Sequence, residues 1–353
     1  MSLLPRFFRH YDLRKVARAL SPRALRLALD FIWPRRDARL PLPTTLVIDV
    51  CSHCNLRCPL CVRGRDEMGR SGRMMTVDEF RRVLDSAPGL LQVNLFDWGE
   101  PLLNKSATQM IRLAAESGIS VNLHSNFSLE LSDDALRELV LSGLDYLSVS
   151  ADGFTQPVYE HYRVRGDIAL VKRNTERVIA LRRELRRERP HVTWQYLVTR
   201  HNSHELALAR AYCERLGVTF FSKPIDVAAT VDYLHGPNYE PPEAWHDATR
   251  LERPPPELAF GDRLRCPHLW WRPVVHADLK VAPCCYVSRA ESDIGDLRAE
   301  SLEAIWNGAR YRYARSLFSP QQQAPRPEGG VVCERCPVVT RYRARRSYPP
   351  VVS

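Results

Sequence analysis

Three cysteines, Cys54, Cys58 and Cys61, lie within one eight-residue stretch and form the pattern Cys-x3-Cys-x2-Cys. The stretch follows an apolar run at residues 44–50, which predicts a buried strand. The three thiols are therefore expected on one loop beyond a strand end. Cysteine thiolates are the usual protein ligands of iron–sulfur clusters. Three of them leave one iron of a four-iron cluster free to bind a molecule that is not part of the protein.

The same stretch has a second interpretation as a zinc site, because Cys51 and Cys54, and then Cys58 and Cys61, form two CxxC pairs. Zinc ribbons separate such pairs by roughly 15–20 residues, whereas only three residues separate them here. Cys51 and His53 are within reach as further ligands, but a fourth protein ligand would close the site. We therefore expect both to be bystanders beside an open cluster.

With its intervening residues, the stretch reads Cys-Asn-Leu-Arg-Cys-Pro-Leu-Cys and resembles the cluster loop of the radical S-adenosylmethionine (SAM) superfamily. The resemblance implies a [4Fe–4S] cluster whose fourth iron is chelated by SAM. It also implies that an electron from the cluster cleaves SAM to a 5′-deoxyadenosyl radical, which abstracts hydrogen from substrate. An external one-electron reductant of the flavodoxin or ferredoxin type would supply that electron. Leu60 departs from the family, which often has an aromatic residue there.

Further segments resemble superfamily motifs that follow successive strands. Residues 98–101 are similar to the Gly-Gly-Glu-Pro segment that binds the SAM amino group, with Trp98 in place of the first glycine. Residues 124–126 stand where the family has Thr-Asn-Gly, and residues 150–153 are similar to Ser-x-Asp-Gly. An arginine downstream completes the set, with Arg165 as the alternative to Arg163, while Gln195, Asn202 and Lys223 are further candidates for the pocket. The SAM contacts implied by the resemblance are Trp98, Gly99, Glu100, Pro101, Asn126, Ser150, Asp152 and Arg163.

The last third of the chain carries a second group of cysteines, with Ser-Leu-x-x-Ile-Trp at residues 301–306 and a closing CxxC pair. This arrangement looks like the SPASM/twitch extension of radical SAM enzymes. The resemblance implies one auxiliary [4Fe–4S] cluster, with Cys284 preferred to Cys285 because it directly follows a proline. A structural zinc site on the same cysteines is the alternative. Leu279 stands where the family's hairpin has glycine. The implied ligands are Cys266, Cys284, Cys333 and Cys336.

Six predicted strands alternate with helices, which argues for an α/β fold with a parallel sheet. The strands are expected at residues 44–50, 91–97, 119–124, 144–150, 192–198 and 218–223. The helices are expected to follow Thr76, which heads a capping box with Glu79, and at 105–117, 132–141, 156–187 and 204–216. The resemblance implies that the sheet closes partway, as a partial (β/α)6 TIM-like barrel with a small C-terminal auxiliary-cluster domain.

Composition supplies the remaining domain boundaries. The chain has 353 residues and a net charge of +10, and its first 40 residues hold ten Lys or Arg against three Asp. We expect a basic amphipathic helix at 1–43, the barrel at 44–225, a Pro-rich linker at 226–265, the auxiliary domain at 266–340 and a basic tail at 341–353. The helix packs on the barrel or contacts an anionic membrane surface. No signal peptide, membrane span or nucleic-acid motif is visible, which favours the cytoplasm.

The expected function is a radical SAM oxidoreductase in which the auxiliary cluster accepts an electron from a substrate radical. Dehydrogenation of a sugar or aminocyclitol is favoured. A maturase acting on a ribosomal peptide or protein is the alternative, weakened because residues 1–43 are short for a leader-binding domain. A zinc-binding interaction protein is the alternative of a different class, and metal analysis separates the two classes.

Overall fold

The computed structural model describes residues 39–225, 266, 268–287, 289–319 and 324–344, together with residues 22, 25, 26 and 29. The predicted helix within 1–43, the linker at 226–265 and most of the tail at 341–353 lie outside the described residues. The predicted membrane contact therefore stays a prediction. Within the described part of the chain, no helix has the length and apolar character needed to cross a membrane.

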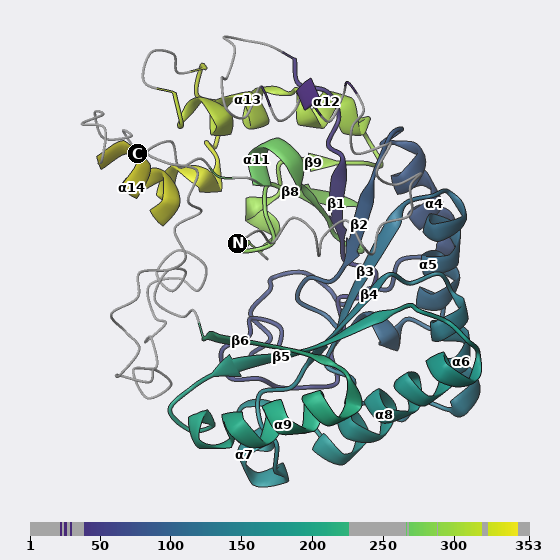
Figure 1. The fold of residues 1–353 in the computed structure, drawn as a ribbon. Helices are drawn as coiled ribbons and strands as arrows, with labels where there is room; N and C mark the ends of the chain where they lie inside the picture. Colours follow the sequence, from purple (N-terminus) through teal and green to yellow (C-terminus); the bar gives the residue numbers. More distant parts are fainter. Residues whose placement is uncertain are drawn as a thin grey trace.

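Six parallel strands form an open, curved sheet in which each strand pairs with the next one along the chain (Figure 1). Because parallel neighbours need crossover connections, a helix follows most of these strands and covers the outer face of the sheet. The expected partial (β/α)6 barrel is confirmed. The strands are β1 (Thr45–Ile48), β2 (Gln92–Leu95), β3 (Ser120–Ser125), β4 (Tyr146–Ser150), β5 (His191–Val198) and β6 (Thr219–Pro224).

The outer helices begin at capping residues. Thr76 and Glu79 form the predicted capping box of α4, and Asp167 accepts hydrogen bonds from two backbone amides at the start of α8. The region expected as one helix at 156–187 is two helices. Arg165, at φ 69°, and Gly166 turn the chain between them. The helices are α4 (Val77–Asp85), η1 (Pro101–Leu103), α5 (Ala107–Glu116), α6 (Asp133–Leu141), α7 (Gln156–Tyr162), α8 (Ile168–Glu184), η2 (Ser203–Glu205) and α9 (Leu206–Leu216).

The two faces of the sheet differ in chemistry. In β4 and β5 the buried residues alternate with half-buried ones. The buried set, including Leu147, Trp194 and Tyr196, belongs to the core under the helices. The half-buried set faces the opposite, inner side and is polar, since Ser148 lies beside Thr193 and Ser150 beside Gln195. A parallel sheet with both faces packed would be apolar throughout, so this inner face is suited to hold a polar ligand.

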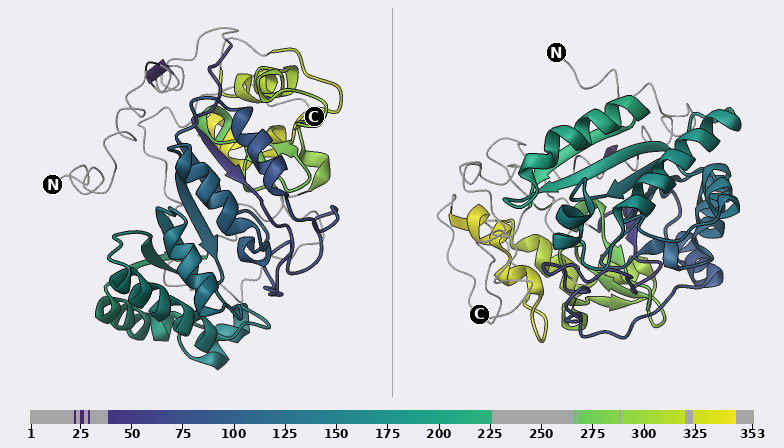
Figure 2. Two further views of the ribbon diagram at one scale, coloured as in Figure 1. Left: turned by 90° about the vertical axis from the view of Figure 1, so that its right-hand side faces the viewer. Right: turned by 90° about the horizontal axis from the view of Figure 1, so that it is seen from below.

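The C-terminal segment continues the same sheet. β7 pairs in parallel with β1, with Val274 opposite Val47, and β8 and β9 follow as antiparallel strands. Figure 2 shows these elements and the helices α8 and α9 at opposite ends of the sheet. Leu279 adopts φ 66° in the β7–β8 turn, where the family's glycine was expected. The elements are α11 (His268–Trp271), β7 (Val274–Val275), β8 (Lys280–Ala282), η5 (Ala290–Ser292), β9 (Gly295–Asp296), α12 (Leu302–Trp306), α13 (Ala309–Ser316), η6 (Val332–Arg335) and α14 (Pro337–Ala344).

Candidate active site

The loop that carries Cys54, Cys58 and Cys61 leaves the C-terminal end of β1 and closes over the strand ends. The backbone of this loop is anchored to the segment that follows α7, because the amide of Arg57 donates to the carbonyl of Val164 at 3.0 Å. The loop also packs against Tyr162, Leu197 and Ile225, which lie beyond the ends of the later strands. The three cysteines are therefore held over the inner face of the sheet.

The thiols of this loop lie close enough to interact electrostatically. Burial, with the charges of Glu100, Cys58 and Cys61 adding to it, raises the pKa of Cys54 to about 12. Burial likewise raises the pKa of Cys58 to about 11, although the positive charge of Arg163 opposes this. A cluster of buried thiols without a cation would stay protonated, whereas metal binding converts them to thiolates.

Asn126, at the end of β3, joins the cysteine loop to the next motif. Its side-chain amide donates to Asn55 Oδ1 at 2.9 Å and lies 3.8 Å from Cys54 Sγ. Its backbone amide donates to Glu100 Oε2 at 2.7 Å. Asn55 in turn donates to the carbonyl of Ser128 at 2.7 Å. The sequence analysis did not single out Asn55, although its place directly after Cys54 within the quoted motif was a usable signal.

Glu100 is buried at the centre of the strand ends, with 1% of its surface exposed. Its carboxylate accepts hydrogen bonds from the amides of Asn126 and Leu102 and from the hydroxyl of Ser125. Burial raises the pKa of Glu100, while these hydrogen bonds lower it. A carboxylate has about four acceptor sites, so Glu100 retains capacity for one more donor, such as the ammonium group that was predicted for it.

Gly99 is required by the protein's own backbone. A Cβ atom at this position would lie 1.7 Å from the carbonyl oxygen of Cys51, so the end of β2 approaches the cysteine loop more closely than any side chain permits. Pro101 begins η1 directly after Glu100. The indole nitrogen of Trp98 is buried and has no hydrogen-bond partner among the described residues. This leaves one N–H donor beside the motif that no described residue accepts from.

Asp152 and Arg163 form a buried ion pair next to the cysteines. Arg163 Nε donates to Asp152 Oδ2 at 2.6 Å, and one terminal guanidinium nitrogen lies 4.0 Å from Cys58 Sγ. The other oxygen of Asp152 accepts from the amide of Leu197 at 2.6 Å. Burial raises the pKa of Asp152, and the charge of Arg163 opposes that rise. Ser150 ends β4 on the polar inner face, in register with Gln195.

The candidate cysteines of the C-terminal segment also gather. Burial raises the pKa of Cys284, and the charges of Cys266, Cys285, Cys333 and Cys336 add to that rise. The largest charge effects on Cys285 come from Arg272, which follows α11, and from Asp97 and Lys223 of the barrel. The charge of Cys285 also raises the pKa of Cys266, so both adjacent cysteines lie near the group, and the choice of Cys284 as the ligand stays a prediction.

Both thiol sets have the chemistry of iron–sulfur ligands. The first offers three thiols from one loop, with Asn126 and Arg163 supplying N–H donors beside the sulfur atoms. Hydrogen bonds of this kind tune cluster potentials. The second offers four thiols, of which that of Cys333 is buried and the others are half-buried. Most of them lie near Tyr311, whose hydroxyl donates to the carbonyl of Ala282 at 3.4 Å. Three thiols suit an open cluster and four suit a closed one.

Sequence comparison assigns both regions. A family model of the radical SAM superfamily matches residues 48–204, and one of an iron–sulfur cluster-binding domain, SPASM, matches residues 266–337. The chain belongs to the radical SAM superfamily and carries a SPASM domain. Members bind SAM at a [4Fe–4S] cluster, and the SPASM domain implies auxiliary iron–sulfur binding.

Several characterised proteins are similar to the chain. The tungsten-containing aldehyde ferredoxin oxidoreductase cofactor-modifying protein of Pyrococcus furiosus is 24% identical over 315 residues, covering 77% of this chain and 83% of that protein. The PqqA peptide cyclase of Bradyrhizobium diazoefficiens is 32% identical over 114 residues, which is 32% of this chain but only 29% of the cyclase. SuiB of Streptococcus suis, solved with its precursor peptide SuiA, shares the fold at a TM-score of 0.57 and 13% identity, covering 77% of this chain and 66% of SuiB.

Proposed function

We propose that this radical SAM enzyme is an oxidoreductase that dehydrogenates a small polar substrate bound between the inner face of the barrel and the auxiliary cysteine group. In this proposal, Cys54, Cys58 and Cys61 hold the SAM-binding cluster. Cys266, Cys284, Cys333 and Cys336 hold one auxiliary cluster. When bound, the first cluster with SAM would supply the radical that removes one hydrogen atom, and the auxiliary cluster would take up the remaining electron as the substrate radical loses a proton.

One observation carries the proposal: the Cys284–Cys285 loop packs against the barrel's own strand ends. Both cysteines contact the apolar cluster that includes Val47 of β1 and Phe96, directly after β2. The ring of Phe96 lies 4.3 Å from the ring of His124 on the inner face of β3. A substrate on the inner face therefore has the SAM motifs on one side and the auxiliary cysteine loop on the other.

The residues around this space support a hydroxylated or otherwise polar substrate. Ser148, Ser150 and Gln195 present hydroxyl and amide groups on the inner face. Lys223 ends β6 and Arg272 follows α11, and the charges of both lower the pKa of His124, which burial brings to about 4. His124 is thus held neutral beside two cations, and can donate or accept a hydrogen bond without carrying a charge.

The predicted SAM contacts have separate tasks in this proposal. Glu100 offers its remaining acceptor site to the SAM ammonium group, and Asn126 fixes the distance between Glu100 and the Cys54 loop. Arg163, paired with Asp152, places a positive charge beside Cys58 and lowers the free energy needed to form the Cys58 thiolate. An external one-electron reductant of the flavodoxin or ferredoxin type is the proposed partner.

A peptide or protein substrate is the second candidate. It is supported by the similarity to PqqA peptide cyclases and by the fold shared with SuiB, which was solved with a precursor peptide. In that case the polar inner face would receive a side chain instead of a free small molecule.

The test begins with anaerobically reconstituted protein. We expect about eight irons per chain and broad absorbance near about 400 nm, together with 5′-deoxyadenosine from SAM under reduction. A panel of deuterated polyols and aminocyclitols should then transfer deuterium to 5′-deoxyadenosine. Zinc in place of iron would overturn the proposal that this protein acts as a radical SAM oxidoreductase. Iron and SAM cleavage without transfer from any polyol, but with transfer from a peptide, would favour the second candidate.

A further inference from the structure

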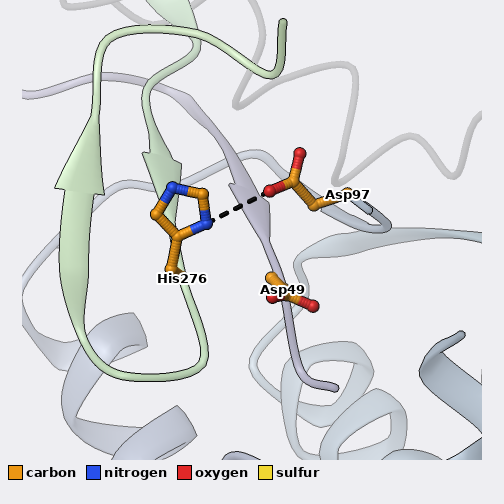
Figure 3. Close-up of side chains that lie close together, drawn as sticks. All are labelled: Asp49, Asp97 and His276. Carbon is orange, nitrogen blue, oxygen red and sulfur yellow. Dashed lines mark ion pairs between the residues drawn. The ribbon is translucent and has the colours of Figure 1, made fainter. Parts of the chain in front are cut away.

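Three polar side chains meet where the barrel joins the C-terminal segment (Figure 3). Asp49 lies directly after β1, on the way to the Cys54 loop. Asp97 lies after β2, two residues before Gly99. His276 follows β7 at the start of the hairpin turn. These residues are far apart in the sequence, and none of them is among the predicted cluster ligands or SAM contacts.

The geometry of the group is that of ligands around a shared ion. The candidate ligand atoms of the three side chains all lie within 4.8 Å of one another. His276 Nδ1 lies 3.1 Å from Asp97 Oδ2, and the two side chains are 1% and 0% exposed. Protein nitrogen and oxygen atoms bind a divalent transition metal at about 2.0–2.2 Å, which separates neighbouring ligands by roughly 3 Å.

Several of these atoms have no hydrogen bond within the described part of the chain. They are both nitrogens of His276, both carboxylate oxygens of Asp97 and Oδ2 of Asp49. The contact between His276 and Asp97 is close, but the ring N–H does not point along it as a hydrogen bond would. A buried polar atom without a partner costs about 1–3 kcal/mol, so atoms with no partner among the described residues are expected to bind something outside that part of the chain.

Arg70 is the cation whose charge acts on both Asp49 and Asp97. Arg70 forms ion pairs with Asp278 at 3.0 Å and with Asp293 at 2.8 Å. Asp293 also lies 3.7 Å from His276 Nε2. The guanidinium of Arg70 is therefore already paired with two carboxylates, and Asp49 and Asp97 are two further acidic groups near it. Burial raises the pKa of Asp49 to about 7, with the charge of Asp97 adding to the rise and those of His276 and Arg70 opposing it. Burial also raises the pKa of Asp97 well above its usual range, although the charge of Arg70 opposes this.

We propose that Asp49, Asp97 and His276 bind a divalent transition-metal ion of the Mn²⁺ or Zn²⁺ type, separate from both iron–sulfur centres. Two carboxylates and one imidazole suit such an ion, whereas thiolate sites select iron–sulfur clusters or zinc. The ion would join the ends of β1 and β2 to the β7–β8 hairpin. Since Oδ1 of Asp49 also accepts from the amide of Cys51 at 3.2 Å, the ion would fix the start of the cysteine loop.

The test uses Mn²⁺ as the probe, because oxygen and imidazole ligands suit it and thiolates do not. Reconstituted holoenzyme is titrated with Mn²⁺, and free aquo-Mn²⁺ is followed by its EPR signal. We expect about one tightly bound ion per chain in the wild type, with nitrogen coupling from one imidazole in the spin-echo spectrum. Asp97→Asn and His276→Gln should weaken binding at least about 30-fold, whereas Asp278→Asn, a neighbouring carboxylate outside the group, should bind normally.

Two results would overturn the proposal. One is wild-type protein that binds no Mn²⁺ at millimolar concentration, which would mean that Asp49 and Asp97 carry protons instead. The other is bound Mn²⁺ without nitrogen coupling, or binding that persists in both variants. Iron content and circular dichroism of each variant show whether it has folded. If neither variant folds, the wild-type titration and its nitrogen coupling decide the question alone.

Discussion

The two cysteine groups of this molecule are built in opposite ways. Cys54, Cys58 and Cys61 come from one loop, so their relation is fixed by spacing along the chain. The four C-terminal cysteines come from three separate segments, before α11, after β8 and around η6, and meet only because the hairpin and the later helices fold over one another. A local motif can be recognised from its spacing, whereas a site of this second kind depends on topology.

The neighbouring residues of the two cysteine groups also differ. The first group has polar and charged neighbours in Asn126 and Arg163, and its three thiols leave room for a further ligand. The second lies beside the buried ring of Tyr311 and near the backbone amides of His268 and Leu269, which lower the pKa of Cys266 against the effect of burial. This difference supports the proposal that the first group binds SAM and that the second group exchanges electrons.

The largest effect is expected from Cys54→Ala. This change should lower iron from about eight to about four per chain and reduce 5′-deoxyadenosine formation to background, because the open cluster is lost. Cys51→Ala is the matched control, since its thiol points to the carbonyl of His53. Iron assay and product chromatography check both variants. Equal iron loss from Cys51→Ala would mean that the first group has four ligands and is closed.

The variants Cys284→Ala and Cys285→Ala test the second cysteine group. Cys284→Ala should also lose about four irons, yet still form 5′-deoxyadenosine from SAM, because the first group is intact. Cys285→Ala should keep all the iron, since its neighbours are Arg272, Asp97 and Lys223. The check is to measure iron content and 5′-deoxyadenosine formation in both variants. The reverse pattern would exchange the roles of the two adjacent cysteines.

A smaller effect is expected from Asn126→Ala. The change removes the donor to Asn55 and Cys54, and the loss of one such bond costs about 1–3 kcal/mol. SAM affinity, measured by calorimetry, should fall about tenfold or more, which corresponds to about 1.4 kcal/mol. Asn122→Ala, in the same strand but bonded to Asn94, is the control. Unchanged SAM affinity in Asn126→Ala would show that the loop is positioned without this residue.

The smallest effect concerns His124, which lies between the two groups. Burial and the charges of Lys223 and Arg272 lower its pKa from 6.5 to about 4. The folded protein then binds fewer protons than the unfolded chain between these values, so stability should fall as pH decreases from about 6.5 to about 4. His124→Gln should reduce this fall by about 1–3 kcal/mol in denaturant titrations. The exposed His204→Gln should not. An unchanged pH slope in His124→Gln would show that His124 is not held neutral.

Much of the fold could be predicted because local sequence patterns determine its strands and helix starts. The apolar runs before Cys54 and before Trp98 became β1 and β2, and Thr76 with Glu79 formed the expected capping box. The predicted SAM contacts follow different strands, yet they meet because the carboxyl ends of parallel strands lie at one edge of the sheet. The hydrogen bond from Asn126 to Glu100 is the clearest instance.

The rest depended on contacts between distant segments. The pairing of β7 with β1 has no local signal, since β7 is only Val274–Val275. The division of the region at 156–187 rests on the positive φ of Arg165, a conformation that the residue type does not indicate. Asp49, Asp97 and His276 are ordinary residues in the sequence, and their proximity appears only once the C-terminal segment has joined the sheet.

The pairing of β7 with β1 also bears on aggregation. In an open sheet the outermost strand exposes unpaired backbone amides and carbonyls, which recruit strands of other molecules. Here β1, whose residues Leu46, Val47 and Ile48 are fully buried, would become such an edge if the C-terminal hairpin were absent. The hairpin thus shields an apolar strand from intermolecular pairing. A barrel without the auxiliary domain would need another segment to cover β1 in order to avoid such pairing.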